Sequence, residues 1–283
     1  MLSSLGAAPK MVDWQGRGYF AYPGGLATPA GTEGGQLPQA GDHIGWLDAL
    51  SRAKHGDFSL LPRLVGLGGA DPHPVMRRLC AELLGDAGPA SVVDTIAARL
   101  ATEDVGFERT LAWGAVLTRR GKLADMPIVL AAFERVATFS DAEMLPVHLS
   151  GCLETGYELC DHQAYDSLQH YRQAVLDRCA ALAEGFGTDQ ICVCGGELLG
   201  VVGLARRMLQ RLREPCFPFE LRRRFECATG IDCSSFYREG VFRPAQAVAI
   251  LQGFIESPHA SRFESGVRYF WGHRIPDQVA DDG

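Results

Sequence analysis

Two successive stretches between residues 60 and 117 repeat one pattern, and this repeat restricts the fold more than any other feature of the chain. Each stretch holds an apolar helical segment, a turn rich in small and acidic residues, and a second apolar segment that opens near an arginine. Aligning Arg77 with Arg109 gives an offset of 32 residues, and offsets of roughly 20–50 residues are typical of stacked helix pairs. We therefore expect an all-α fold of antiparallel helical hairpins.

Apolar spacing and turn residues predict the remaining helices and three ranges of different composition. Prolines at 72 and 74 favour a helix start, because proline is tolerated in the first turn but not in the interior. Further helices are expected at 89–101, 107–119, 124–137, 141–155, 162–184, 195–213, 219–229 and 244–256. The chain is thus predicted to hold an irregular N-terminal arm (1–42), a helical repeat domain (43–256) and an aromatic C-terminal tail (257–283).

The N-terminal arm is rich in Gly, Pro and Thr, which are turn signals without sustained periodicity. It also carries Trp14, Tyr19, Phe20 and Tyr22, which are too many aromatic residues for a solvated linker. We expect them to pack on the first helices. The alternative is an arm that binds a partner.

The C-terminal tail, SRFESGVRYFWGHRIPDQ, is dense in aromatic residues and arginine. Alternating residue types between 267 and 272 are compatible with a short strand or an irregular packed tail. The last unit of a helical stack leaves an apolar face that must be covered. We therefore predict that Phe263, Tyr269, Phe270 and Trp271 are buried as a closure, and the alternative is a hot spot for partner binding.

Charge and composition restrict the partner and the compartment. The chain has 27 Lys and Arg against 34 Asp and Glu, a formal net charge of −7 and a pI near 5.6. This balance argues against a nucleic-acid coat, since phosphate binding depends on clustered cations, and it suits a basic partner. The start lacks a secretory signal pattern, and no apolar run approaches the ~20 residues that span a bilayer. We therefore expect a cytoplasmic protein, and the 24 Arg against three Lys, with no Asn, indicate a GC-rich, bacterial genome.

Two segments resemble known families. The stretch ADPHPVMRRLCAELLGDAG resembles HEAT-like repeats, in which an Asp-Pro turn precedes the second helix and an arginine follows within it. The resemblance covers residues 60–155 and implies a HEAT-like α-solenoid. The tail segment SGVRYFWGHRIP is similar to the tails of immunity proteins from bacterial polymorphic toxin systems. That resemblance implies toxin neutralisation through protein–protein interaction, and it assigns no catalytic residue.

The cysteines offer one candidate for a metal site. Cys192 and Cys194 form a C-x-C pair, but a structural zinc site needs four converging ligands, which usually come as two spaced pairs. We interpret the nine cysteines as mostly buried, reduced side chains. No metal or cofactor is predicted, although the sequence leaves open whether this pair binds metal.

Seven arginines between 206 and 224 form the other candidate site. Such a cluster is usually a solvated face, and the functional alternative is an anion-binding patch like the basic concave face of HEAT-like DNA glycosylases. The chain has no G-x-S-x-G elbow, P-loop or H-E-x-x-H motif, so no catalytic residue is predicted. His273 is interpreted as structural, with a base or metal ligand as the alternative.

Together these patterns predict a protein–protein interaction scaffold, most specifically an immunity protein that binds and neutralises a cognate toxin, and not an enzyme. The alternative is a HEAT-like nucleic-acid-binding enzyme such as a DNA glycosylase. The sequence leaves the partner's identity, the binding face and the oligomeric state open. The predicted partner-binding residues are Tyr269, Trp271, His273, Arg274, Arg206, Arg207 and Arg211.

Overall fold

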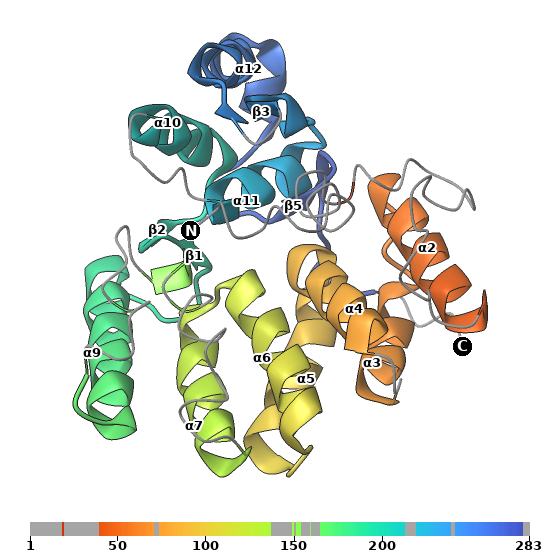
Figure 1. The fold of residues 1–283 in the computed structure, drawn as a ribbon, viewed down its shortest axis with the longest axis vertical. Coiled ribbons are helices and arrows are strands. Elements are labelled where there is room, and N and C mark those ends of the chain that lie inside the picture. Colours follow the sequence, from red (N-terminus) through yellow and green to blue (C-terminus); the bar gives the residue numbers. More distant parts are fainter. Residues whose placement is uncertain are drawn as a thin grey trace. The chain divides into compact units, whose positions relative to one another are not determined.

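The structure is a computed structural model, and it describes residues 19, 40–70, 74–136, 149, 151–153, 159, 165–212, 219–238 and 241–279. These ranges are mostly helical, which confirms the predicted all-α class (Figure 1). The chain forms two compact units: unit 1 is Met1–Asp57 with Gly200–Arg274, and unit 2 is Phe58–Leu199 with Ile275–Gly283. The three ranges predicted from the sequence, 1–42, 43–256 and 257–283, do not coincide with these two units. That division of the chain stays a prediction.

Unit 2 is a series of helices that follow one another side by side (Figure 1). The predicted helices at 89–101, 107–119, 124–137 and 162–184 each have a counterpart within a few residues, except that the last begins at 168. The helix predicted at 141–155 lies largely outside the described residues. The described helices are α3 (Leu61–Ala70), α4 (Pro74–Ala87), α5 (Ala90–Thr102), α6 (Phe107–Arg120), η3 (Leu123–Asp125), α7 (Met126–Val136) and α9 (Leu168–Phe186).

The helices of unit 2 pack both within pairs and from pair to pair. Helix α3 packs on α4 and α5 packs on α6, while α4 contacts α6, α5 contacts α7, and α7 contacts α9. Glycine allows two close contacts, one of α4 with α6 and one of α6 with α7. A Cβ atom on Gly85 would lie 2.5 Å from the Cβ of Arg119, and one on Gly114 would lie 3.1 Å from the Phe133 ring. The close approach of the helices thus depends on residues without a side chain.

Arginine side chains link successive helix pairs of unit 2. Each link joins residues that are 31 to 38 positions apart, close to the 32-residue offset of the sequence repeat. The links are Arg77 to Glu108 at 2.9 Å, Arg119 to Asp86 at 2.9 Å, Arg135 to the carbonyl of Leu100, and Arg172 to Glu134 at 3.0 Å. The same kind of contact therefore recurs with the period of the repeat.

Unit 2 ends in a hairpin where the sequence predicted the first turns of a helix. Strands β1 (Val193–Cys194) and β2 (Glu197–Leu198) pair in antiparallel fashion. Their turn is Gly195-Gly196, with φ values of 59° and 72°. The prediction of a helix from residue 195 is wrong because this left-handed turn, which glycine adopts at little cost, interrupts the helical path. Helix α10 starts only at Val201.

Unit 1 combines the first described helix with residues 200–274. Helix α10 contacts α11 and α12, α11 contacts β5, and α12 contacts η6. Helices α11 and α12 have the predicted bounds. The elements are α2 (Ala40–Lys54), α10 (Val201–Arg211), α11 (Phe219–Thr229), η6 (Ser234–Phe236), β3 (Tyr237–Arg238), β4 (Val241–Phe242), α12 (Pro244–Glu256), η7 (Pro258–Arg262), β5 (Tyr269–Phe270) and β6 (His273–Arg274).

No helix among the described residues is long and apolar enough to cross a membrane.

Candidate functional site

The tail forms a short hairpin whose aromatic side chains are mostly enclosed. Strands β5 and β6 pair in antiparallel fashion, so of the two forms that the sequence left open, a short strand and an irregular packed tail, the structure has the strand. Phe263, Tyr269 and Phe270 are buried, and Trp271 is half-buried. Rings of Phe254, Phe263 and Tyr269 meet edge to face at 4.9 to 5.7 Å. The predicted burial is confirmed for Phe263, Tyr269 and Phe270.

The hairpin turn is held against the end of α11. The backbone N–H of Trp271 donates to the carbonyl of Cys227 at 2.7 Å, and that of Gly272 donates to Ala228 at 2.8 Å. These carbonyls belong to the last helical turn, where intrahelical donors run out. Trp271 has φ 54°, the only positive value among described residues other than glycine. The strained conformation thus aims two donors at the helix end.

Trp271 is also contacted from two other segments of unit 1. The Nζ of Lys54 lies 4.4 Å from the centre of its ring, a cation–π distance. A Cβ on Gly230 would lie 3.0 Å from the Cδ1 of Trp271, so the indole rests directly on glycine backbone. Lys54 also donates to the carbonyl of Tyr19 at 2.7 Å. Burial lowers the pKa of Lys54 to about 8, since a desolvated ammonium is less stable than the neutral amine.

Tyr19 brings the N-terminal segment to this hairpin. Its side chain is buried and meets Phe270 edge to face at 5.5 Å. Tyr19 is buried as expected, but its ring meets the tail hairpin, whereas the sequence predicted packing on the first helices. Trp14, Phe20 and Tyr22 lie outside the described residues.

Of the four tail residues predicted to bind a partner, only His273 and Arg274 are exposed. The hydroxyl of Tyr269 donates to the carbonyl of Arg262 at 3.2 Å and accepts from the N–H of Glu264 at 3.1 Å. Tyr269 is therefore used inside the fold. Arg274 lies 3.9 Å from Glu264 in an exposed ion pair, which contributes little to stability.

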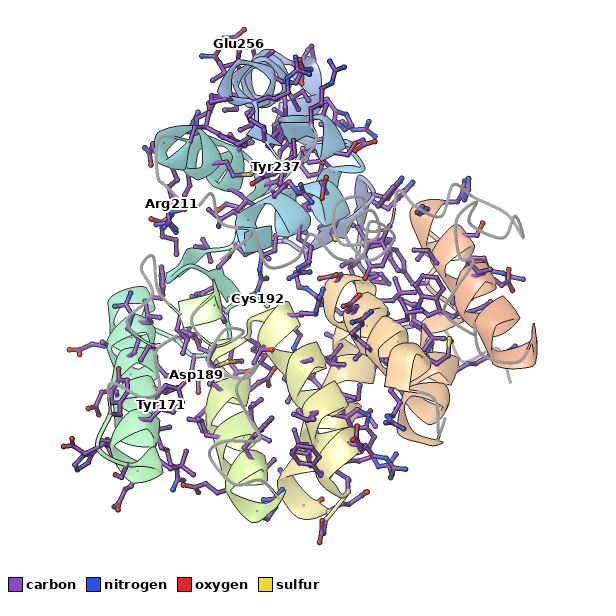
Figure 2. All side chains as sticks on the ribbon, in the orientation of Figure 1. Tyr171, Asp189, Cys192, Arg211, Tyr237 and Glu256 are labelled. Carbon is purple, nitrogen blue, oxygen red and sulfur yellow. The ribbon has the colours of Figure 1, made fainter. Side chains whose placement is uncertain are left out.

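Helix α10 carries the three predicted arginines at different depths. Arg206 is exposed, and Arg207 and Arg211 are half-buried. Figure 2 shows Arg211 at the C-terminal end of α10. The opposite face of α10 is buried through Val201, Leu204, Ala205 and Met208. This amphipathic pattern holds the arginines at the surface of unit 1.

The arginines of α11 are placed differently from those of α10. Arg222 and Arg223 are buried, so the cluster from 206 to 224 is not one solvated face. The Nε of Arg222 lies 3.6 Å from Glu226, and its guanidinium is 5.5 Å from the ring centre of Tyr237. Because these two arginines are buried inside unit 1, they cannot contribute to a phosphate-binding surface.

Glu226 is the most strongly perturbed carboxyl group that the structure describes. It is 5% exposed, and its Oε1 accepts a hydrogen bond from the N–H of Cys233 at 3.0 Å. Burial raises the pKa of Glu226 to about 7, and the nearby Arg222 only partly opposes this shift. Its sequence neighbour Asp232 is exposed and accepts from the N–H of Ser234. Asp232 lies close enough to raise the pKa of Glu226 further, but Asp232 is at the surface whereas Glu226 is buried.

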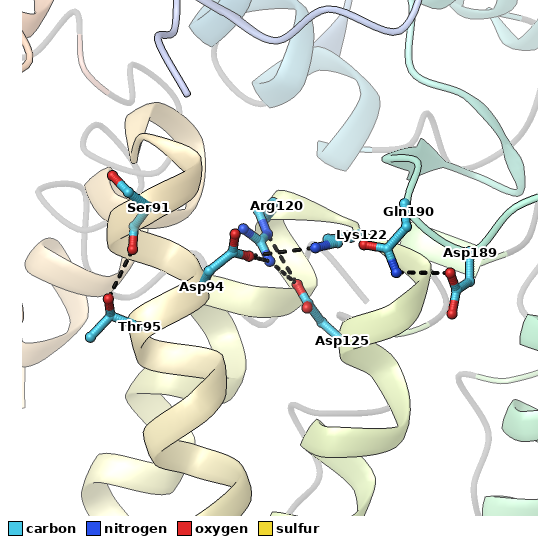
Figure 3. A network of polar contacts seen from close by, with 8 residues as sticks. All are labelled: Ser91, Asp94, Thr95, Arg120, Lys122, Asp125, Asp189 and Gln190. Atoms are coloured by element: carbon cyan, nitrogen blue, oxygen red, sulfur yellow. Dashed lines mark hydrogen bonds and ion pairs between the residues drawn. The ribbon is translucent and has the colours of Figure 1, made fainter. Parts of the chain in front are cut away.

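A charged network joins three elements of unit 2 (Figure 3). The Nη2 of Arg120 lies 2.7 Å from both Asp94 and Asp125, and Lys122 reaches Asp94 at 3.5 Å. Burial raises the pKa of Asp125 although Arg120 opposes the shift. The network ties α5, α6 and η3 together and has a structural role. Sequence reasoning missed it, because Asp94 and Arg120 meet only through the packing of two helices.

The cysteines do not converge on a metal site in the described part of the chain. No group of three His, Cys, Asp or Glu there could hold a metal ion. Six of the seven described cysteines are buried, and Cys192 is half-buried. The expectation of buried thiols is confirmed for those six, and burial raises the pKa of Cys179 to about 12.

The two units differ in the sign of their charge. Unit 1 contains 16 Lys and Arg against 12 Asp and Glu, a net charge of +4. Unit 2 contains 11 against 22, a net charge of −11. The whole-chain value of −7 conceals this asymmetry.

No family model matches the chain, and no curated protein and no solved structure matches it either.

Proposed function

We propose that this protein is a HEAT-like interaction protein whose acidic unit 2 binds a basic protein partner. The order of packing supports a solenoid: α3, α5, α7 and α9 contact one another in sequence, and α4 contacts α6. The arginine links at the repeat spacing add a second, independent support. Stacked helix pairs present extended surfaces that suit a protein ligand.

The observation that carries the proposal is the acidity of this stack. Its acidic residues outnumber its basic residues two to one, and many stand exposed on successive helices and the turns between them. Such a surface attracts a cationic partner and accelerates its association. The exposed carboxylates include those of Asp94, Glu103, Asp104, Glu108, Asp177, Glu184 and Asp189.

The proposed partner is a basic toxin domain encoded beside this protein, and the proposed activity is its neutralisation in the bacterial cytoplasm. A cationic surface that contacts RNA or DNA in a toxin is the kind of surface that an acidic protein can cover. Neutralisation then needs only binding, so the proposal assigns no catalytic residue and no cofactor.

Co-expression with the product of the neighbouring gene tests the proposal. The two proteins should co-purify, and added protein should inhibit the toxin at equimolar ratio. Reversing two exposed charges on α9, Asp177→Lys with Glu184→Lys, should weaken binding by about tenfold or more through lost electrostatic complementarity.

A matched variant controls for net charge. Asp48→Lys with Glu256→Lys changes the total charge equally, but both sites are exposed in unit 1. That variant should bind like the parent. Equal losses in both variants, or no co-purification at all, would contradict the proposal.

A further inference from the structure

The C-terminal part of unit 1 has a net positive charge, because residues 200–274 contain 12 Arg against 7 Asp and Glu. Between residues 200 and 274, nine described arginines are exposed or half-buried, against three described acidic residues at the surface. Glu226 does not compensate, because it is buried. The arginines are Arg206, Arg207, Arg211, Arg224, Arg238, Arg243, Arg262, Arg268 and Arg274, and the acidic residues are Asp232, Glu256 and Glu264.

Helix α10 and Arg243, the residue that precedes α12, contribute part of this positive charge. Helix α10 has three arginines and no acidic residue over its full length. Arg243 immediately precedes α12, which packs on α10. Within the described ranges, the guanidinium groups of Arg206 and Arg243 form no ion pair. A basic face of this kind requires an acidic counterpart to be neutralised on binding.

Single-stranded nucleic acid is a poorer match than an acidic protein. Such ligands stack their bases on available aromatic rings. The ring of Trp271 is already contacted by Lys54 and by the backbone at Gly230, and Tyr269 and Phe270 are buried. What unit 1 offers at its surface is therefore charge, without a stacking platform at the hairpin.

We propose that the basic surface of unit 1 binds the acidic surface of unit 2 in a second copy of this chain. The two surfaces carry opposite net charge, +4 and −11, and thus supply both sides of the contact. Contact between unlike surfaces is heterologous, so a pair of copies keeps one free surface of each kind and association can continue head to tail. The inference does not depend on the proposed toxin partner.

Sedimentation velocity of the full chain over a range of protein and salt concentrations tests this inference. At about 20 mM NaCl the sedimentation coefficient should rise with protein concentration, and at about 300 mM NaCl the rise should disappear, because salt screens exposed charges. Arg206→Glu with Arg243→Glu brings unit 1 from +4 to 0 and should weaken self-association by about tenfold.

A control variant distinguishes loss of this contact from general electrostatic repulsion between more negatively charged copies. Arg63→Glu with Arg78→Glu gives the same whole-chain charge of −11, but both changes lie in exposed positions of unit 2. This variant should associate at least as well as the parent. Equal weakening in both variants would overturn the inference.

Two further outcomes would also overturn it. One is a parent protein that sediments as a monomer at every salt and protein concentration. The other is a monomer that binds a fluorescent 20-nucleotide DNA oligonucleotide at low salt, with binding lost in Arg206→Glu/Arg243→Glu. The basic surface would then serve a nucleic acid.

Discussion

At the scale of single residues, the buried carboxyl group of Glu226 makes the stability of the fold depend on pH. Its folded-state pKa is about 7, against 4.5 in an ordinary environment. Between pH 4.5 and pH 7, Glu226 is protonated in the folded state but ionised in the unfolded state. This contribution to the free energy of unfolding therefore falls as pH rises from about 4.5 to about 7, and it is constant above pH 7. The fall is at most about 3 kcal/mol, from roughly 1.4 kcal/mol per pKa unit.

Glu226→Gln should remove this part of the pH dependence. The amide oxygen can still accept from Cys233, while the buried negative charge is gone. Urea denaturation at pH 5 and pH 8 measures the difference for parent and variant. Identical pH profiles of the two proteins would show that Glu226 is not the responsible group.

Trp271 gives a second prediction at this scale, based on its backbone. Its φ of 54° favours glycine over any other residue. Trp271→Ala loses the ring contacts with Lys54 and keeps the strain, whereas Trp271→Gly loses the contacts and relieves it. We expect both variants to be less stable than the parent, with Gly more stable than Ala by about 1 kcal/mol. Thermal denaturation compares them; the reverse order would contradict the left-handed conformation.

The same residues show where sequence reasoning reached its limit. The tail was recognised as unusual from its aromatics, and their burial follows from their size and apolarity. The hydroxyl of Tyr269 forms hydrogen bonds with the backbone of Arg262 and Glu264. The sequence could not predict these bonds, because both depend on the path of the chain through η7. A residue type favoured in binding sites is equally suited to a core.

At the scale of elements, the contact of α4 with α6 depends on Gly85. Alanine usually stabilises a helix by about 1 kcal/mol relative to glycine. Here the added Cβ would lie 2.5 Å from Arg119, so the helices must move apart. We expect Gly85→Ala to destabilise the protein by about 1–3 kcal/mol, as overpacking does.

Gly66→Ala on α3 is the matched control. A Cβ there meets nothing within 4 Å. The substitution should therefore stabilise by up to about 1 kcal/mol through helix propensity. Chemical denaturation of both variants measures the opposite signs; stabilisation by Gly85→Ala would mean that α4 and α6 are not in this contact.

Element prediction succeeded where periodicity was sustained and failed where backbone conformation changed locally. The bounds of α11 and α12 were predicted because prolines and glycines mark their ends. The β1–β2 hairpin was missed, because apolar residues around Gly195-Gly196 continue a helical spacing that the left-handed turn breaks. Strands of two residues are too short to show an alternating pattern.

At the scale of the whole molecule, the grouping of α2 with residues 200–274 was beyond sequence reasoning. It rests on contacts such as Lys54 with Trp271, which join residues 217 positions apart. A repeat is visible in sequence because neighbouring pairs contact each other, whereas a closure between distant segments leaves no periodic signal. The charge asymmetry, in contrast, follows the order of the chain: residues 58–199 contain 11 Lys and Arg against 19 Asp and Glu, and residues 200–274 contain 12 against 7. Only the whole-chain total conceals it.

Two units with separate cores lead to the last prediction. Unit 1 encloses Trp46, Phe225 and Phe270, and unit 2 encloses Trp113 and Tyr171. Cores of this kind open as separate cooperative units. In hydrogen exchange measured by mass spectrometry, Trp271→Ala should therefore lower protection in α2, α11 and α12 while α5 and α6 keep theirs. Gly85→Ala should do the opposite. A uniform loss of protection in either variant would show that the two units unfold together. A substitution in one core can lower protection in the other core only if the two units unfold cooperatively.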